Sequence, residues 1–281
     1  MDSISPNKVL ASAIAAAHAA GAVMRENLRA EKKANEITSH DIKLELDVRC
    51  QKLIERKLHA AFPKIALLGE EGDAGDANAE FRWVVDPIDG TVNFARGLPH
   101  ASVSIALQKR VEGRGSRVEG KMRRRAKELI TYPSSHITLV GVVYDPFQDE
   151  LWTAIRGQPA KLNGRVIHVS TRQNPGECIV SIGFAKNRAN LERALPYFTW
   201  LARHVMKIRM MGSAALALTY VATGRLDAYV ECGISLWDIA AGGLILECAG
   251  GKFWHEATHG PHKFRMVASN GRVHKKLPVP K

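Results

Sequence analysis

The chain has 281 residues, 46% of them hydrophobic, and a formal net charge of +12. This length and composition predict a globular protein with a sizeable core, built as one large domain or as two intimate subdomains. The four cysteines show no C-x-x-C spacing, which argues against a zinc site and a disulfide framework and suits a reducing cytoplasm. The alanine-rich stretch 9–24 has little apolar bulk and contains His18, so we expect an amphipathic helix there and no membrane segment.

The positive charge is concentrated in one segment. Between residues 109 and 127 the basic residues outnumber the acidic ones by nine to two, a net of +7, so the remainder of the chain carries only +5. A basic cluster of this kind can follow a nucleic-acid backbone. It contains no interleaved aromatic residues for base stacking, however, so we expect a solvated surface loop and regard a nucleic-acid partner as the less favoured alternative.

Two helices are predicted first. Residues 8–28 show a helical pattern with an alanine-rich face, and a second pattern has apolar residues at 53, 54, 58 and 62 before it stops at Pro63. Asp47 stands at the start of the second pattern, where a helix N-cap is the ordinary explanation for an aspartate.

A short apolar strand follows at 65–68, and Gly69 then allows the backbone to turn. Two glutamates, Glu70 and Glu71, come directly after it. Successive side chains of an extended chain alternate in direction, so only one of the two can face a given site.

The next stretch, 83–97, carries the strongest chemical signal. An apolar run at 83–85 predicts a buried strand, and Asp86 and Asp89 follow it at once. Neighbouring carboxylates repel each other, so their ionisation is best explained by a hard divalent cation with oxygen ligands, of which magnesium fits best. Gly90 and Thr91 then begin a short helix whose free N–H groups can hold a phosphate. Taken alone, the same residues would also suit an ordinary surface turn.

The remaining elements alternate between strands and helices. Residues 101–108 alternate as a strand does, and the basic stretch 111–136, with a helical pattern at 119–130, is expected to be a mobile surface loop without a catalytic part. We then expect strands at 141–146 and 152–155, a hairpin at Asn163-Gly164 that returns at 166–170, a strand at 178–183, a helix at 191–206, a helix from 212 to 223 closed by Gly224, a strand at 227–231, a helix at 239–249 and a strand from Gly251.

Three motifs occur in one order along the chain: Gly69-Glu70-Glu71, the run Asp86-Pro87-Ile88-Asp89-Gly90-Thr91-Val92-Asn93-Phe94, and Trp237-Asp238-Ile239-Ala240-Ala241-Gly242. In these motifs the chain resembles the inositol monophosphatase family of magnesium-dependent, lithium-sensitive sugar phosphatases. The resemblance implies an α/β fold, a layered α-β-α-β-α sandwich with mixed or antiparallel sheets between helix layers. It also implies one catalytic unit over 1–281, with a metal and phosphate half at about 1–150 and a substrate half at about 151–281, usually as a homodimer. The basic loop at about 111–136 replaces a short turn of the family.

The resemblance also implies a metal site with two or three Mg²⁺ ions. Its ligands would be the side chains of Glu70, Asp86, Asp89 and Asp238 and the carbonyl of Ile88. Glu70 and Thr91 would orient the attacking water, and Asp47 would lie beneath the site, hydrogen-bonded toward Thr91. The sequence has Ile42-Lys43 where the family usually has Val-Thr before this aspartate. For Asp238, capping of a helix N-terminus remains the alternative explanation.

For the substrate, the resemblance assigns the phosphate to the N–H groups of Gly90 and Thr91. The alcohol would contact Asp89, the helix start at Gly212, Ser213 and Ala214, and Glu231, although Ser213 is also an ordinary helix N-cap. The expected reaction is hydrolysis of inositol monophosphate to myo-inositol and phosphate. Relatives that cleave fructose bisphosphate, histidinol phosphate or nucleotide 3′-phosphates remain alternatives. So does a regulatory relative that binds RNA or protein through the basic insertion.

Overall fold

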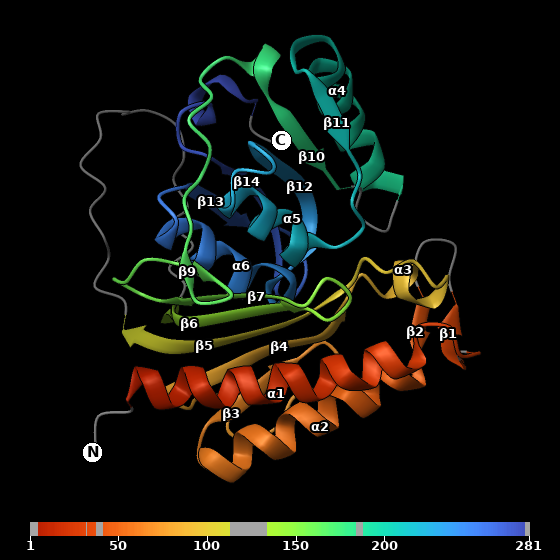
Figure 1. Ribbon diagram of the computed structural model, residues 1–281, viewed down its shortest axis with the longest axis vertical. Helices are drawn as coiled ribbons and strands as arrows, with labels where there is room; N and C mark the ends of the chain where they lie inside the picture. The colour runs from red at the N-terminus through yellow and green to blue at the C-terminus, as the bar shows by residue number, and fades with distance from the viewer. Residues whose placement is uncertain (1–4, 32, 38–41, 113–133, 184–187, 279–281) are drawn as a thin grey trace.

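Helices and sheets alternate in five layers. The structure is a computed structural model that describes residues 5–31, 33–37, 42–112, 134–183 and 188–278. In Figure 1 two helices cover one face of a large sheet, two more lie between that sheet and a second one, and another covers the far face of the second sheet. In this order the helices are α1 (Pro6–Asn27) and α2 (Glu45–Ala61), then α5 (Ala214–Ala222) and α6 (Leu236–Cys248), then α4 (Arg188–His204). The layered sandwich implied by the resemblance is confirmed.

The first sheet runs through seven of the described strands in sequence order. Its strands are β3 (Ala66–Gly69), β4 (Phe81–Asp89), β5 (Ser102–Glu112), β6 (Ser134–Asp145), β7 (Glu150–Ile155), β8 (Lys161–Leu162) and β9 (Arg165–Val166). β3 is parallel to β4, and the later neighbours are antiparallel. Asn163 and Gly164 both have positive φ angles, 48° and 80°, as the two-residue hairpin predicted at this point requires.

The second sheet has the described strand order β11-β10-β12-β14-β13. Parallel pairs join β10 to β11 and to β12, whereas β14 is antiparallel to both of its neighbours. The strands are β10 (Ile179–Ile182), β11 (Lys207–Arg209), β12 (Ala228–Ser235), β13 (Lys252–Ala257) and β14 (Lys263–Ser269). Outside the two sheets lie β1 (Ala34–Ile37) paired with β2 (Ile42–Leu44), the short helix α3 (Thr91–Ala95), and 3₁₀ turns at Pro175–Glu177 and His274–Lys276.

Apolar side chains fill each space between the layers. Trp83 and Met24 belong to the cluster between the first sheet and α1 and α2, and Trp152 and Leu218 to the cluster around α5 and α6. α6 lies against the backbone of β6, where a Cβ at Gly141 would come within 2.8 Å of the Ala241 carbonyl oxygen. A glycine at this point therefore allows the middle helix layer to approach the first sheet closely.

Several boundaries differ from the sequence prediction; of the return strand expected at 166–170, for example, only residue 166 belongs to β9. β4 does not stop before Asp86 but continues through an irregularity to Asp89. β12 runs past Glu231 to Ser235, and α6 begins at Leu236, so Asp238 occupies the third helical position. Of the basic loop predicted at 111–136, both ends are strand instead, because β5 runs to Glu112 and β6 begins at Ser134. Residues 113–133, with the helical pattern predicted at 119–130, lie outside the described residues. Within the described ranges, no helix combines the length and apolar character needed to cross a membrane.

Candidate active site

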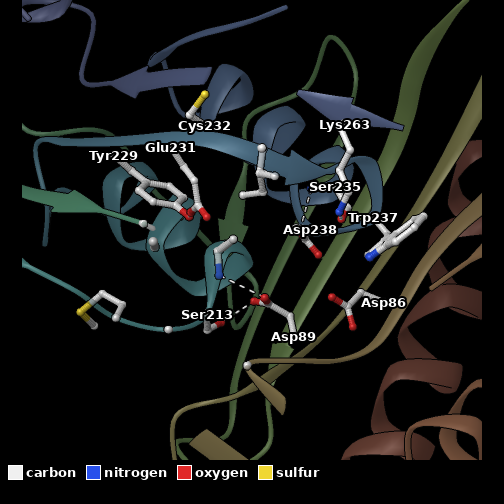
Figure 2. Close-up of a pocket in the computed structure, with 18 of the residues that line it drawn as sticks. Asp86, Asp89, Ser213, Tyr229, Glu231, Cys232, Ser235, Trp237, Asp238 and Lys263 are labelled. Carbon is white, nitrogen blue, oxygen red and sulfur yellow. Dashed lines mark hydrogen bonds between the residues drawn. The ribbon is translucent and has the colours of Figure 1, made fainter. Parts of the chain in front are cut away.

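Three aspartates converge at one end of a cavity. Carboxylate oxygens of Asp86, Asp89 and Asp238 all lie within 4.8 Å of one another, and the three side chains point toward a common space in Figure 2. Asp86 and Asp89 come from β4 in the first sheet, and Asp238 comes from α6 in the middle layer. The cavity of about 940 Å³ extends from this cluster to the second sheet. The structure thus brings together carboxylates that are about 150 residues apart in the chain.

The irregularity in β4 explains why Asp86 and Asp89 face the same space. Side chains three residues apart in a regular strand point to opposite faces of the sheet. Here Asp86 is opposite Ser104 and Asp89 is opposite Ser102, so three steps on β4 correspond to two on β5. The extra residue is a β-bulge, which reverses the alternation and re-aims one side chain. The backbone N–H of Ile88 also donates to Asp86 Oδ1 at 3.0 Å.

Asp238 combines a helix-capping bond with its place in the cluster. Its Oδ2 accepts a hydrogen bond from the backbone N–H of Ser235, the N-cap of α6, at 2.9 Å. A carboxylate in the first turn also interacts favourably with the helix dipole. Ser104 Oγ donates to the Trp237 carbonyl at 3.1 Å and ties β5 to this turn. Asp238 therefore caps α6, as the alternative explanation expected, and its carboxylate also belongs to the acidic cluster.

Burial and mutual repulsion oppose ionisation of the cluster. The pKa of Asp86 is raised well above its usual value, first by burial and then by repulsion from Glu70, Asp89 and Asp238. Burial, followed by repulsion from Asp238, raises the pKa of Asp89 to about 6, although hydrogen bonds from α5 lower it in part. A divalent cation would remove this repulsion, and an all-oxygen donor set suits a hard ion such as Mg²⁺. The residues present therefore fit the metal that the resemblance implies.

Asp89 also joins the first sheet to the start of α5. Ser213 Oγ and the Ala215 N–H donate to Asp89 Oδ2, the latter at 2.8 Å, and the Ala214 N–H donates to Oδ1 at 3.1 Å. Ser213 Oγ in turn accepts from the Leu216 N–H, so this serine is the N-cap of α5 as well. Groups that the resemblance assigns to a substrate hydroxyl are thus bonded to Asp89 in this structure.

Glu70, Ile88 and Thr91 line the same cavity. Glu70 follows directly after β3, and its N–H donates to the Val85 carbonyl at 3.2 Å, which holds the residue beside β4. Thr91 Oγ1 donates to the Ile88 carbonyl oxygen at 2.9 Å and keeps lone pairs that can accept a further bond. Glu71 is not among the residues that line the cavity.

Gly90 fills a place that other residues cannot take. Its φ is 96°, and a Cβ would lie 3.0 Å from the His100 carbonyl oxygen and 3.1 Å from that of Gly212. Asp47 is buried in the first turn of α2, where its Oδ2 accepts from the Leu44 N–H at 2.8 Å, and it does not line the cavity. Its predicted hydrogen bond toward Thr91 stays a prediction.

Glu231 lies on β12, on the far side of the cavity from Asp86 (Figure 2). The Tyr229 hydroxyl donates to Glu231 Oε2. Burial, and then the Glu231 charge, raise the pKa of Tyr229 well above its usual value, so this tyrosine keeps its proton. A Cβ at Gly183, the residue after β10, would collide with the Glu231 carboxylate. A glycine at this position therefore leaves room for that carboxylate.

Among the cavity residues to which the sequence motifs gave no role are Asn93, Tyr229 and Lys263. Asn93 Nδ2 donates to the carbonyl oxygens of His100 and Met211, both at 2.9 Å, and so fixes α3 relative to the loop before α5. Tyr229 stands two residues before Glu231 on one strand, and the period of two was a signal that could have placed it beside the glutamate. Lys263 offered no local signal, because its position depends on the pairing of β12 with β14.

Comparisons with known proteins agree with the fold and with the family that the motifs indicate. The model of the inositol monophosphatase family matches residues 5–116 and 129–278. The Nus factor SuhB of Pasteurella multocida is 36% identical over 253 residues, which are 87% of this chain and 84% of the relative. The crystal structure of extragenic suppressor protein suhB from Bartonella henselae has a TM-score of 0.81 at 30% identity, covering 96% of each chain. Inositol monophosphatase from Anabaena has a TM-score of 0.75 at 32% identity, covering 95% of this chain and 92% of that one. On these matches, together with the three motifs and the layered fold, the chain belongs to the inositol monophosphatase family.

Proposed function

We propose that this protein is a magnesium-dependent phosphatase that hydrolyses inositol monophosphate to myo-inositol and phosphate. The observation that supports this most is the convergence of Asp86, Asp89 and Asp238 within 4.8 Å at one end of the cavity. Glu70 and the first turn of α3 line the same end, so acidic ligands and a phosphate-binding backbone are neighbours.

The proposed metal ligands form two groups that share Asp86. Glu70, Asp86 and the Ile88 carbonyl would hold one ion, and Asp86, Asp89 and Asp238 would hold a second. The site would hold two or three ions in all. When bound, Mg²⁺ ions lower the pKa of a water molecule and neutralise charge on the phosphoryl oxygens. The carboxylates keep these ions fixed, and their own raised pKa values return toward normal as the cation offsets their repulsion.

The chain's own residues then position the substrate and the water. Glu70 and Thr91 would hold the attacking water in line with the ester bond, and Glu70 would accept its proton. The N–H groups of Gly90 and Thr91 would donate to phosphate oxygens as charge develops on them. Asp47 would act from beneath by orienting Thr91.

Glu231 supports a polyhydroxylated alcohol as the leaving group. Its carboxylate is held by Tyr229 and stands across the cavity from the aspartates, where it can accept hydrogen bonds from sugar hydroxyls. Asp89 and the α5 start at Gly212, Ser213 and Ala214 would contact other hydroxyls, with Asp89 exchanging part of its present bonds for them. This arrangement also suits fructose bisphosphate, histidinol phosphate or a nucleotide 3′-phosphate, which therefore belong in the test.

The test is phosphate release from a panel of inositol, sugar, histidinol and nucleotide phosphates, with Mg²⁺, with a chelator, and with added lithium. We expect the highest kcat/KM for inositol monophosphate, loss of activity with the chelator, and inhibition by lithium. A chain that releases phosphate from no ester on the panel refutes the phosphatase proposal. Faster hydrolysis of another ester refutes the inositol assignment alone.

A second candidate follows from the relatives that are named Nus factors, among them one from Escherichia coli that is 34% identical over 273 residues. This chain would then have a regulatory role in which the basic residues 109–127 contact RNA or protein. Steeply salt-dependent RNA binding that is lost on deletion of 114–127 supports this candidate, and absence of binding at low salt refutes it. We further propose a cytoplasmic homodimer; the division into metal and substrate halves stays a prediction.

A further inference from the structure

Lys263 places a positively charged side chain at the edge of the acidic cluster. It begins β14 and is the cross-strand partner of Ser235, the last residue of β12. Its Nζ donates to Ser235 Oγ at 2.7 Å, and the N–H of the same serine donates to Asp238 Oδ2. Figure 2 shows the lysine nitrogen beside Ser235, on the side of the cavity where Asp238 points in. Ser235 therefore connects Lys263 to Asp238, a proposed metal ligand.

The lysine side chain is held in place by its neighbours. It is half-buried, and its Nζ lies 6.0 Å from the centroid of the Trp237 ring, a cation–π distance. Trp237 lines the cavity beside it, and the buried indole nitrogen of Trp237 has no hydrogen-bond partner in the described parts of the chain. A cation and an unused N–H donor thus stand together next to the carboxylates. The lysine ammonium can bind an anion, whereas the indole nitrogen is buried and the carboxylates themselves repel anions.

The net charge of the site changes when a phosphate ester binds. Glu70, Asp86, Asp89 and Asp238 together would carry four negative charges, which two divalent ions balance. A phosphate monoester brings about two more negative charges, so a further positive charge is useful only when the substrate is bound. Before that, a fixed cation close to Asp238 repels a metal ion. An ammonium group in this position therefore favours phosphate and disfavours magnesium.

We propose that Lys263 binds the phosphate group of the substrate together with the metal ions, and that it does so at the expense of metal affinity. The inference rests on the proposed phosphatase function and adds to it a residue outside the three motifs. It predicts two changes of opposite direction when the charge is removed: Mg²⁺ binds more tightly, and phosphate binds more weakly. A purely structural role, the tie between β14 and the start of α6, would weaken both.

The experiment uses Lys263→Gln, which keeps a polar side chain without the charge, and Lys263→Arg, which keeps the charge. Lys161→Gln is the matched control, because Lys161 is an exposed lysine on β8 that does not line the cavity. Calorimetric titration measures Mg²⁺ binding to the full chain, and then inorganic phosphate binding at saturating Mg²⁺. Thermal unfolding of each variant verifies that it is folded, and phosphate release from the best ester of the panel gives kcat and KM.

For Lys263→Gln we expect Mg²⁺ affinity to rise and phosphate affinity to fall, each on the order of threefold to tenfold, as for one charge near a partly exposed site. KM should rise with the phosphate dissociation constant, and both differences should shrink at high ionic strength. Lys263→Arg and Lys161→Gln should resemble the wild type. If Lys263→Gln leaves both affinities unchanged, or weakens both Mg²⁺ and phosphate binding, the inference is wrong. As long as the wild type turns over substrate, that result does not affect the proposed function. Absence of turnover by the wild type refutes the function, and the inference falls with it.

Discussion

Replacement of Asp89 by asparagine tests whether the metal site can be disrupted without a large change in the stability of the fold. Asp89 is 6% exposed, lies in the acidic cluster, and accepts hydrogen bonds from the start of α5. The change removes one negative charge without changing the size of the side chain. We expect turnover to fall by at least about 100-fold, since a group that helps hold transition-state charge is lost. Stability without metal should change little, because two effects oppose each other.

The first effect stabilises the variant. In the metal-free protein the pKa of Asp89 rises from 3.8 to about 6 on folding, so keeping it ionised at pH 7 costs about 3 kcal/mol, at about 1.4 kcal/mol per unit of pKa. The second effect destabilises it. An amide offers one oxygen to donors that now approach both carboxylate oxygens, so at least one bond from α5 is lost, at about 1.5–3 kcal/mol. The net change should stay within about 2 kcal/mol.

The assay is thermal unfolding with and without Mg²⁺, together with phosphate release. Mg²⁺ at 100 times its Kd should stabilise the wild type by about 2.7 kcal/mol, and most of this stabilisation should be absent in Asp89→Asn. Asp145→Asn is the matched control: Asp145 is fully buried and caps the turn after β6 by accepting from two backbone N–H groups, and it does not line the cavity. A near-normal rate in Asp89→Asn, or an unchanged response to Mg²⁺, refutes the proposed role of Asp89 at the second metal.

Three further outcomes test other parts of the site. Gly183→Ala should displace Glu231 and raise KM about tenfold, in line with one lost charged hydrogen bond. Gly176→Ala, whose added Cβ would meet no atom within 4 Å, should behave as the wild type in the same kinetic assay. Asn93→Ala leaves two backbone carbonyls without their donor and should lower the free energy of unfolding by about 1–3 kcal/mol, measured by urea denaturation, together with kcat. Folding raises the pKa of Asp89 to about 6, so the contribution of Asp89 to the free energy of unfolding is present below pH 4 and is lost as pH rises through 6. Denaturation of the metal-free protein should show this fall in stability. With Mg²⁺ bound, the fall should disappear. A metal-free stability that instead rises between pH 4 and 6 through this group would contradict the assignment.

The local features of the site were predictable because each follows from neighbouring residues. Two aspartates after a buried apolar run predict a charged strand end, and Asn163-Gly164 predicts a two-residue hairpin, which the positive φ angles confirm. The motifs predicted the family as well. What they predicted for Asp86 and Asp89 was a position at the end of a strand. Asp89 does end β4, but Asp86 lies within the strand, before a bulge, because pairing with β5 continues past the apolar run.

Long-range contacts were not predictable from such patterns. The bonds from Ser213, Ala214 and Ala215 to Asp89 span about 125 residues, and no local periodicity reports them. Asp238 was expected to begin its helix, whereas α6 begins two residues earlier with Ser235 as its N-cap. Serine is a preferred N-cap, so the signal for the true start was present.

Lys263 shows how the core decides a feature of the site that no motif encodes. On β14, Met266 and Ala268 are buried against the middle helix layer, and Val267 is buried on the α4 side. Because Met266 and Ala268 face one core and Val267 faces the other, a slip of one residue would exchange the two faces and mismatch the packing of both cores, so the pairing with β12 is strongly specified. The same pairing sets Lys263 opposite Ser235, next to Asp238. The packing of three apolar residues therefore determines where the cation stands relative to the carboxylates.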